Sequence, residues 1–176
     1  MGRDHVLKGT TRVLALLMLL QTPVHAQDSA AQQIPVISEF IGTWKGQGNL
    51  LGSEATFSMK WEWVLGQRFV RLTFENRMQG PDGVERVLQA QAFYRPVGEG
   101  RLEGTWFDSR GMVLPLVGSS EQTTLTTLWG TPATEEGRTV YRLLDEGLIE
   151  VKDFVLKGDQ WQKFGQALYR RVASNR

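Results

Sequence analysis

The sequence predicts an all-β protein, an antiparallel up-and-down barrel of about ten short strands. From residue 40 onward, apolar and polar residues alternate with a period of two, which is the spacing of a half-buried strand. Short links containing glycine, proline and aspartate separate the alternating segments. No segment after Phe40 keeps a helical period for three turns.

The first strand begins in the segment 41–48, IGTWKGQG. The clearest alternation follows in EATFSMKWEWV, where one face carries Ala55, Phe57, Met59, Trp61 and Trp63. The tight turn Leu65-Gly66-Gln67 joins this strand to a third one, which alternates over residues 70–75. Two alternating segments joined by a short glycine-containing link indicate a β-hairpin.

The remaining strands continue this pattern to the end of the chain. They are predicted near residues 84–95, 101–108, 112–118, 122–130, 138–144, 148–156 and 160–172. Successive antiparallel strands form a meander, and closing the meander removes the exposed strand edges. A two-sheet sandwich is the alternative architecture that this strand spacing leaves open.

Residues 1–26 have the features of a secretory signal peptide. Three basic residues precede the apolar core 13–20, and the segment ends in the small-residue cleavage signal Val24-His25-Ala26. The apolar core is shorter than the roughly 20 residues that a membrane-spanning helix needs. We therefore expect cleavage after Ala26 and a periplasmic or secreted protein without a membrane span.

The rest of the chain is expected to hold one domain. Residues 27–39 are interpreted as a flexible lead-in or short cap, and residues 40–173 as a single β-barrel domain. The sequence has no cysteine, so an apolar core must stabilise it without disulfides. All 6 tryptophans and all 8 phenylalanines lie after the predicted cleavage site, which makes such a core plausible.

The missing residue types exclude several kinds of chemistry. The only histidines are His5 and His25, both inside the predicted signal peptide. Without histidine or cysteine, the mature chain has no Ser-His-Asp or Cys-His mechanism and no ordinary zinc site. No metal and no cofactor is predicted. The formal net charge of +1 shows no basic excess, so no nucleic-acid partner is predicted either.

The carboxylates are scattered along the chain and are interpreted as solvated charges on the outer face. They are Glu62, Glu75, Glu103, Asp108, Asp145, Glu150 and Asp153. A glycosidase-like mechanism needs two carboxyl groups held about 5–10 Å apart, and their spacing in the sequence does not pair any two of them. No catalytic residue is therefore assigned.

The aromatic residues are the positive signal for a ligand site. The candidate ligand-binding residues are Phe57, Met59, Trp61, Trp63, Phe74, Tyr94 and Trp106. Ordinary core packing is the alternative explanation of these side chains. A barrel of about ten strands is wider than one that side chains readily fill, which favours a lined, partly apolar cavity.

The first and last strands of a meander barrel meet, so residues from the two chain ends can form a closure. A terminal arginine, Arg170 or Arg171, can lie over the face of Trp44 as a cation–π contact worth about 0.5–2 kcal/mol. Strict alternation places Trp161 on the same face as Arg171 and Phe164 on the face of Arg170. The choice between the two arginines depends on the strand register.

Several short motifs, taken in order, resemble those of calycin-like barrels: lipocalins, fatty-acid-binding proteins and nitrobindin-like haem barrels. The closer resemblance is to a bacterial domain-of-unknown-function family with that kind of barrel. The matching residues are the GTW start at 42–44, Trp61 to Phe69 as W-x-x-x-L-G-x-R-F, Gly104-Thr105-Trp106 with Asp108-Ser109, and the terminal Tyr169-Arg170. The match spans about residues 40–172.

This resemblance implies a calycin-like barrel and, from lipocalins, an apolar small ligand. Nitrobindin-like barrels hold haem through a histidine in the C-terminal part, and this chain has none there. A tyrosinate ligand to haem would have to come from Tyr94, Tyr141 or Tyr169.

The leading hypothesis is an exported, soluble, non-catalytic barrel that binds a small apolar or amphipathic molecule in its interior. One alternative is a carboxylate- or tyrosine-based enzyme acting on a lipid or a sugar. Another is a protein-interaction module of an envelope assembly.

Overall fold

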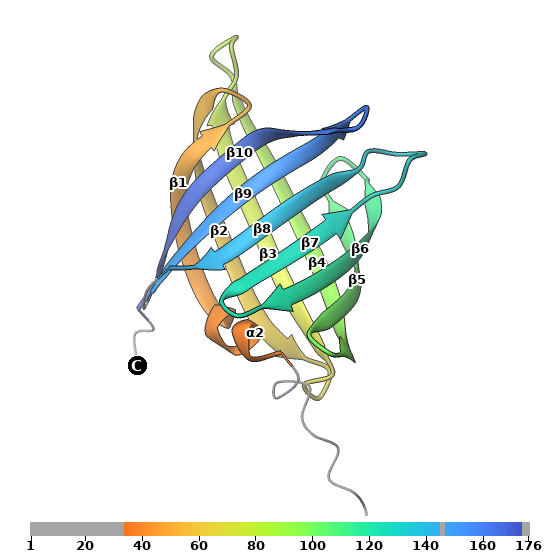
Figure 1. Ribbon diagram of the computed structural model, residues 1–176. Helices are drawn as coiled ribbons and strands as arrows, with labels where there is room; N and C mark the ends of the chain where they lie inside the picture. The colour runs from red at the N-terminus through yellow and green to blue at the C-terminus, as the bar shows by residue number, and fades with distance from the viewer. Residues whose placement is uncertain (1–33, 145–146, 174–176) are drawn as a thin grey trace, which may run out of the picture.

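The computed structural model describes residues 34–144 and 147–173, which form one closed antiparallel barrel (Figure 1). Ten strands follow one another around the barrel in chain order, and the first strand pairs with the last. The predicted all-β, up-and-down barrel is confirmed, and the two-sheet sandwich is excluded. The predicted signal peptide with its cleavage after Ala26 lies outside the described residues.

The described elements are one short helix and the barrel strands. They are α2 (Pro35–Phe40), β1 (Gly42–Leu50), β2 (Ser53–Val64), β3 (Phe69–Gln79), β4 (Glu85–Gly98), β5 (Arg101–Asp108), β6 (Val113–Glu121), β7 (Thr124–Trp129), β8 (Gly137–Leu143), β9 (Leu148–Lys157) and β10 (Gln160–Arg171). Within residues 34–144 and 147–173, no helix has both the length and the apolar character needed to cross a membrane.

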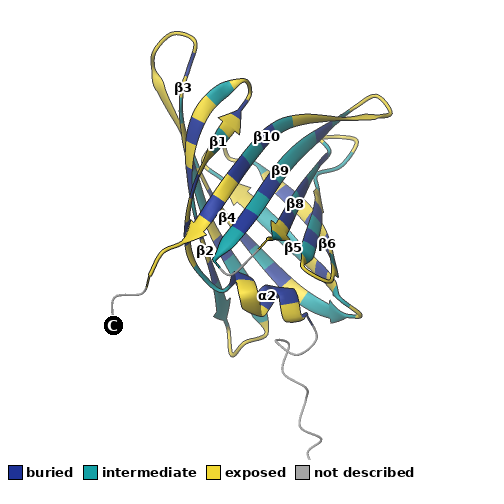
Figure 2. Cartoon of the chain, turned by 60° about the vertical axis from the view of Figure 1, so that its left-hand side comes forward, coloured by how far each residue is buried: buried dark blue, intermediate teal, exposed yellow. Residues whose placement is uncertain are grey.

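Buried residues alternate with exposed or intermediate ones along most strands, as Figure 2 shows for β10 and β9. The period of two that predicts the strands therefore also separates the barrel interior from the surface. Where β1 pairs with β10, a glycine leaves room for a large side chain on the neighbouring strand. A Cβ atom on Gly46 would lie only 2.8 Å from the ring of Tyr169, so glycine leaves the space that this ring fills.

One part of the predicted alternation is wrong, because β10 contains a bulge. The register between β10 and β9 shifts between Lys163 and Gly165, which places one extra residue, Phe164, in β10. Phe164 therefore packs on the core, whereas Trp161 lies on the outer face against Arg138. Strict alternation had predicted that Trp161 shares the face of Arg171 and that Phe164 lies on the opposite face.

Helix α2 lies across one end of the barrel, and we call this the capped end (Figure 1). Phe40 packs on Trp61 and on Tyr141, with ring centroids 5.8 Å and 6.1 Å apart. Trp61 also stacks on Tyr94 with a centroid distance of 5.7 Å. Phe40, Trp61 and Tyr94 are each at most 1% exposed, so the capped end is filled by side chains.

Arg171 connects the first and the last strand of the barrel to helix α2. Its guanidinium lies 4.3 Å from the ring centroid of Trp44 and donates to the backbone carbonyls of Glu39 and Ile41. Trp44 in turn donates from Nε1 to the carbonyl of Phe40 at 2.7 Å. A cation at a helix C-terminus satisfies carbonyls that the helix leaves free.

Arg170 takes no part in this arrangement. It is exposed and lies opposite Lys45 on the outer face of the barrel. The register therefore selects Arg171 as the partner of Trp44.

Candidate functional site

The end opposite α2, which we call the open end, has an inner surface that solvent reaches. Several inward-facing apolar side chains there are only partly buried although they pack against the core. They are Phe74, Met78, Trp106, Trp129 and Phe164. Among the described residues no helix covers this end (Figure 1). A partly exposed apolar lining inside a barrel is the kind of surface that small ligands cover.

One wall of the open end is a row of aromatic rings. Phe57 on β2 lies beside Phe74 on β3, with ring centroids 6.4 Å apart. Phe74 lies beside Trp106 on β5 at 5.8 Å. The row leads from the buried centre of the barrel, where Phe57 is only 6% exposed, to the partly exposed Trp106.

The opposite wall is built around Trp129 on β7. Its ring meets Phe164 edge-on at a centroid distance of 6.4 Å. It also covers the backbone of Gly137, where a Cβ atom would lie 1.8 Å from the ring. Glycine at this position and the bulge at Phe164 are therefore what bring the two rings together.

Asp153 on β9 is a carboxylate that faces the barrel interior beside this wall. The hydroxyl of Thr139 donates to its Oδ1 at 2.7 Å, and Trp129 Nε1 donates to the Thr139 oxygen at 3.3 Å. Gly165 lies opposite Asp153, and a Cβ atom there would be 3.0 Å from Oδ2. Thr139 thus fixes the carboxylate, and Gly165 leaves room for it.

Burial raises the pKa of Asp153 to about 6, although the hydrogen bond from Thr139 partly counteracts the rise. The neighbouring groups that sense its charge are Tyr141 on β8 and Tyr169 on β10. Within residues 34–144 and 147–173, no lysine or arginine forms an ion pair with Asp153. Asp153 is therefore a carboxylate without a counter-ion on the inner surface.

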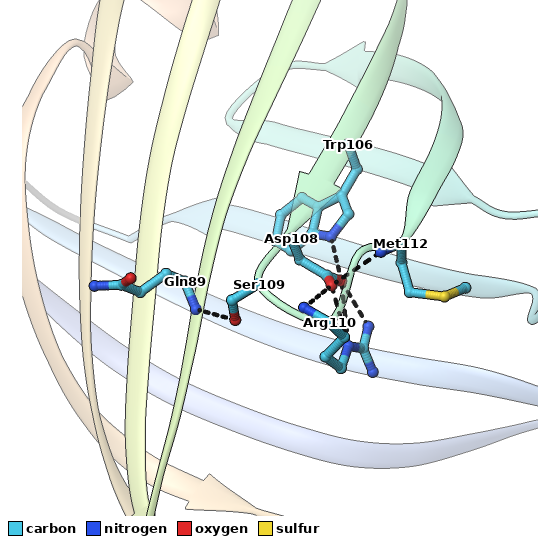
Figure 3. A network of polar contacts seen from close by, with 6 residues as sticks. All are labelled: Gln89, Trp106, Asp108, Ser109, Arg110 and Met112. Atoms are coloured by element: carbon cyan, nitrogen blue, oxygen red, sulfur yellow. Dashed lines mark hydrogen bonds and ion pairs between the residues drawn. The ribbon is translucent and has the colours of Figure 1, made fainter.

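Asp108 is a second acid at the rim of the open end, and it is fully engaged (Figure 3). Its Oδ2 accepts from Trp106 Nε1 at 3.0 Å and from Arg110 Nη2 at 2.7 Å. Its Oδ1 accepts from the backbone amides of Arg110 and Met112. Burial opposes ionisation, but the hydrogen bonds from Arg110 and Trp106 outweigh it and lower the pKa of Asp108 to about 2.

The interpretation of the acids as outer-face charges therefore holds only for some of them. Glu62, Glu75, Glu103 and Glu150 form ion pairs on the outer face, and Asp145 lies outside the described residues. Asp108 and Asp153 turn inward instead. They belong to two separate networks of hydrogen bonds among the described residues.

The candidate ligand-binding residues are divided between the two ends of the barrel. Met59, Trp61 and Tyr94 are buried in the packing of the capped end, and Trp63 packs partly buried against the same core. Phe57, Phe74 and Trp106 form the aromatic row that reaches the open end. The structure thus offers Phe74 and Trp106, and neither Phe57 nor the first group, to a molecule entering from solvent.

The wall formed by Trp129, Thr139, Asp153 and Phe164 is not among the ligand-binding residues that the sequence predicts. A signal for Asp153 was present, because the acid occupies an inward position of the alternating segment that also contains Ile149, Val151 and Val155. Phe164 gave no such signal, since the bulge reverses its face.

The donor set of the open end does not fit a haem or a transition metal. Both histidines of the chain lie outside the described residues, and the described part contains no cluster of three metal-ligating side chains. Burial raises the pKa of Tyr94, of Tyr141 and of Tyr169, which disfavours a tyrosinate ligand.

An open groove of about 870 Å³ also crosses the outer face of β1, β2, β3 and β10. Most of its lining residues are polar or charged, among them Lys45, Gln47, Thr56, Ser58, Arg77 and Arg170. Arg77 is already paired with Glu75 and Glu85. A small molecule in this groove would compete with water at every polar group, so we place the candidate site at the open end.

No protein-family model matches the chain, and no curated protein matches its sequence. Its fold is similar to the crystal structure of Rv2717c from M. tuberculosis, with a TM-score of 0.60 and 17% sequence identity over 82% of this chain and 98% of that one. A de novo designed fluorescence-activating β-barrel gives a TM-score of 0.41 at 14% identity, over 82% of this chain and 98% of the designed one. The likeness to Rv2717c shows a shared barrel fold, and a barrel of this kind is compatible with binding a small molecule.

Proposed function

We propose that this protein is an exported binding protein for a small amphipathic molecule, which it holds in the open end of the barrel. The observation that carries the proposal is the partly exposed apolar lining of that end, next to an inward-facing carboxylate. An apolar ligand body that covers these side chains gains about 25 cal/mol for each Å² it removes from water. The side chains that fill the capped end form the closed floor of this site.

Tryptophan fluorescence tests the proposal, because the tryptophans differ in position. We would titrate the mature protein with Nile red, an uncharged environment-sensitive dye, and with decanol. Binding at the open end should change the emission of the protein. Most of that change should be lost in Trp106→Phe and Trp129→Phe and retained in Trp61→Phe, whose ring is buried at the capped end.

Two results would count against this function. If neither probe changes the fluorescence or binds by calorimetry, the open end is not a ligand site. If Trp61→Phe alone removes the response, a molecule enters the capped end and the site is wrongly placed.

A protein-contact surface is the second candidate function, and an exposed apolar stripe on the outer face favours it. The stripe consists of Phe107, Val113, Val117 and Leu128. The pairs Phe107–Val113 and Val117–Leu128 lie directly opposite each other across β5, β6 and β7. Contiguous exposed apolar side chains are typical of contact surfaces. Cross-linking in the native envelope tests this role, which predicts that Val117→Lys abolishes a cross-linked product that Trp129→Phe leaves intact.

A further inference from the structure

We propose that the open end selects an amphipathic molecule with a cationic head group, an alkylamine or ammonium, and that Asp153 is the residue that binds the head. This inference rests on the proposed function, because it names the class of ligand for the same site.

The geometry of the carboxylate points to a missing partner. Asp153 Oδ1 accepts from Thr139, whereas Oδ2 has no donor among the described residues and is not a fully buried atom, so solvent or a ligand can reach it. The hydroxyl of Thr139 is itself occupied, since it accepts from Trp129 Nε1 while it donates to Asp153. The side chain is therefore held in one orientation with one oxygen unused. An ammonium group would supply the absent charge-assisted hydrogen bond.

The charge of the surroundings favours a cation over an anion. Two basic residues next to Thr139 and Asp153 in the sequence have other partners. Arg138 lies over Phe154 and Trp161 on the outer face, and Lys152 pairs with Glu150. The other inward acid, Asp108, is neutralised by Arg110. A fatty-acid carboxylate at this position would face Asp153 with no compensating cation from the described part of the chain, which is unfavourable in a partly buried site.

The aromatic rings beside Asp153 suit the same head group. Trp129 is connected to the carboxylate through Thr139, and Phe164 meets Trp129 at 6.4 Å and immediately precedes Gly165, the residue opposite Asp153. Aromatic faces attract ammonium ions, and indole does so most strongly. The alkyl chain of the ligand would then extend along the apolar lining toward Phe74 and Trp106.

The test compares three ligands of equal chain length, each below its critical micelle concentration: decylamine, decanol and decanoate. Affinities are measured at pH 7.5 by calorimetry with the wild-type protein, so the main comparison needs no substitution. We expect decylamine to bind about tenfold or more tighter than decanol, and decanoate to bind weakest. In Asp153→Asn, the amine should lose its advantage while decanol binds as before. The matched control is Glu150→Gln, which removes an acid from the outer face of the same strand.

The possible results distinguish the proposed binding function from the proposed recognition of a cationic head group by Asp153. If decylamine and decanol bind equally well, or if Asp153→Asn weakens both to the same degree, the cationic head group is wrong while the binding function stands. If Glu150→Gln reduces the amine preference as much as Asp153→Asn, the preference arises from surface charge and the assignment to Asp153 is overturned. If none of the three binds, the proposed function fails and the inference fails with it.

Discussion

The guanidinium of Arg171 lies 4.3 Å from the ring centroid of Trp44, and the same group donates to two backbone carbonyls beside helix α2. Trp44 belongs to the first strand and Arg171 to the last, so this contact lies on the seam that closes the barrel. Both residues also bind the helix, because Trp44 donates to the carbonyl of Phe40. Closure of the barrel and attachment of its cap therefore depend on one group of side chains.

Replacement of Arg171 by alanine should lower the free energy of unfolding by about 2 kcal/mol, because it removes a cation–π contact and two charge-assisted hydrogen bonds. Urea denaturation followed by tryptophan fluorescence measures the loss. Arg170→Ala is the control: this neighbouring arginine is exposed and should change stability by no more than about 0.5 kcal/mol. Equal losses in the two variants would show that the contact of Arg171 with Trp44 contributes nothing beyond surface charge.

Replacement of Asp153 by asparagine should stabilise the protein at alkaline pH. The folded pKa of about 6 lies above the ordinary value of 3.8, so the folded state favours the protonated acid. Its favourable contribution is complete below pH 4 and is lost as the pH rises through 6. The variant should therefore gain up to about 3 kcal/mol relative to the wild type between pH 4 and pH 8. Thermal unfolding across this range measures the gain, and a difference independent of pH would contradict the raised pKa of Asp153.

Replacement of Asp108 by asparagine should have the opposite dependence on pH. The folded pKa of Asp108, about 2, lies below the ordinary value of 3.8. Its contribution to stability is present above pH 4 and is lost as the pH falls toward 2. The variant should lose about 2 kcal/mol at pH 7 and much less near pH 2. Glu103→Gln, which breaks only an exposed ion pair with Arg95, serves as the comparison and should be nearly neutral.

Alanine at position 137 should displace Trp129, because its Cβ atom would overlap the indole ring. We expect a loss of about 1–3 kcal/mol in the free energy of unfolding and a shift in tryptophan emission. In the background of Trp129→Leu the same substitution should cost much less, since the ring is no longer there. A double-mutant cycle measures this coupling, and additive effects would show that Gly137 is required for another reason.

The sequence predicted the strands well because a strand is specified by a local pattern. The alternation over Phe57, Met59 and Trp61 appears as a buried inner face, and glycine-containing turns join the successive strands. The closing contact of Trp44 was also expected from the order of the strands. The sequence could not choose between Arg170 and Arg171, because that choice depends on how residues more than 120 positions apart pair.

The candidate site was predicted only in part, for a related reason. Phe74 and Trp106 were expected and lie at the open end, whereas Met59 and Trp61 support the capped end instead. Alternation assigns a face to a residue, but it does not say at which end of the barrel helix α2 will pack. That end is determined by the contacts of Phe40 with Trp61 and Tyr141.

The sequence by itself determined an antiparallel barrel, its ten strands and the absence of histidine and cysteine after the predicted cleavage site. Those features follow from composition and from the period of two, which act over a few neighbouring residues. Only the tertiary structure decided that Phe164 turns inward and that Asp153 lies beside Trp129 with no counter-ion among the described residues. A bulge shifts the register of a whole strand, and burial changes the charge preference of a carboxyl group, so both depend on partners that are distant in the sequence.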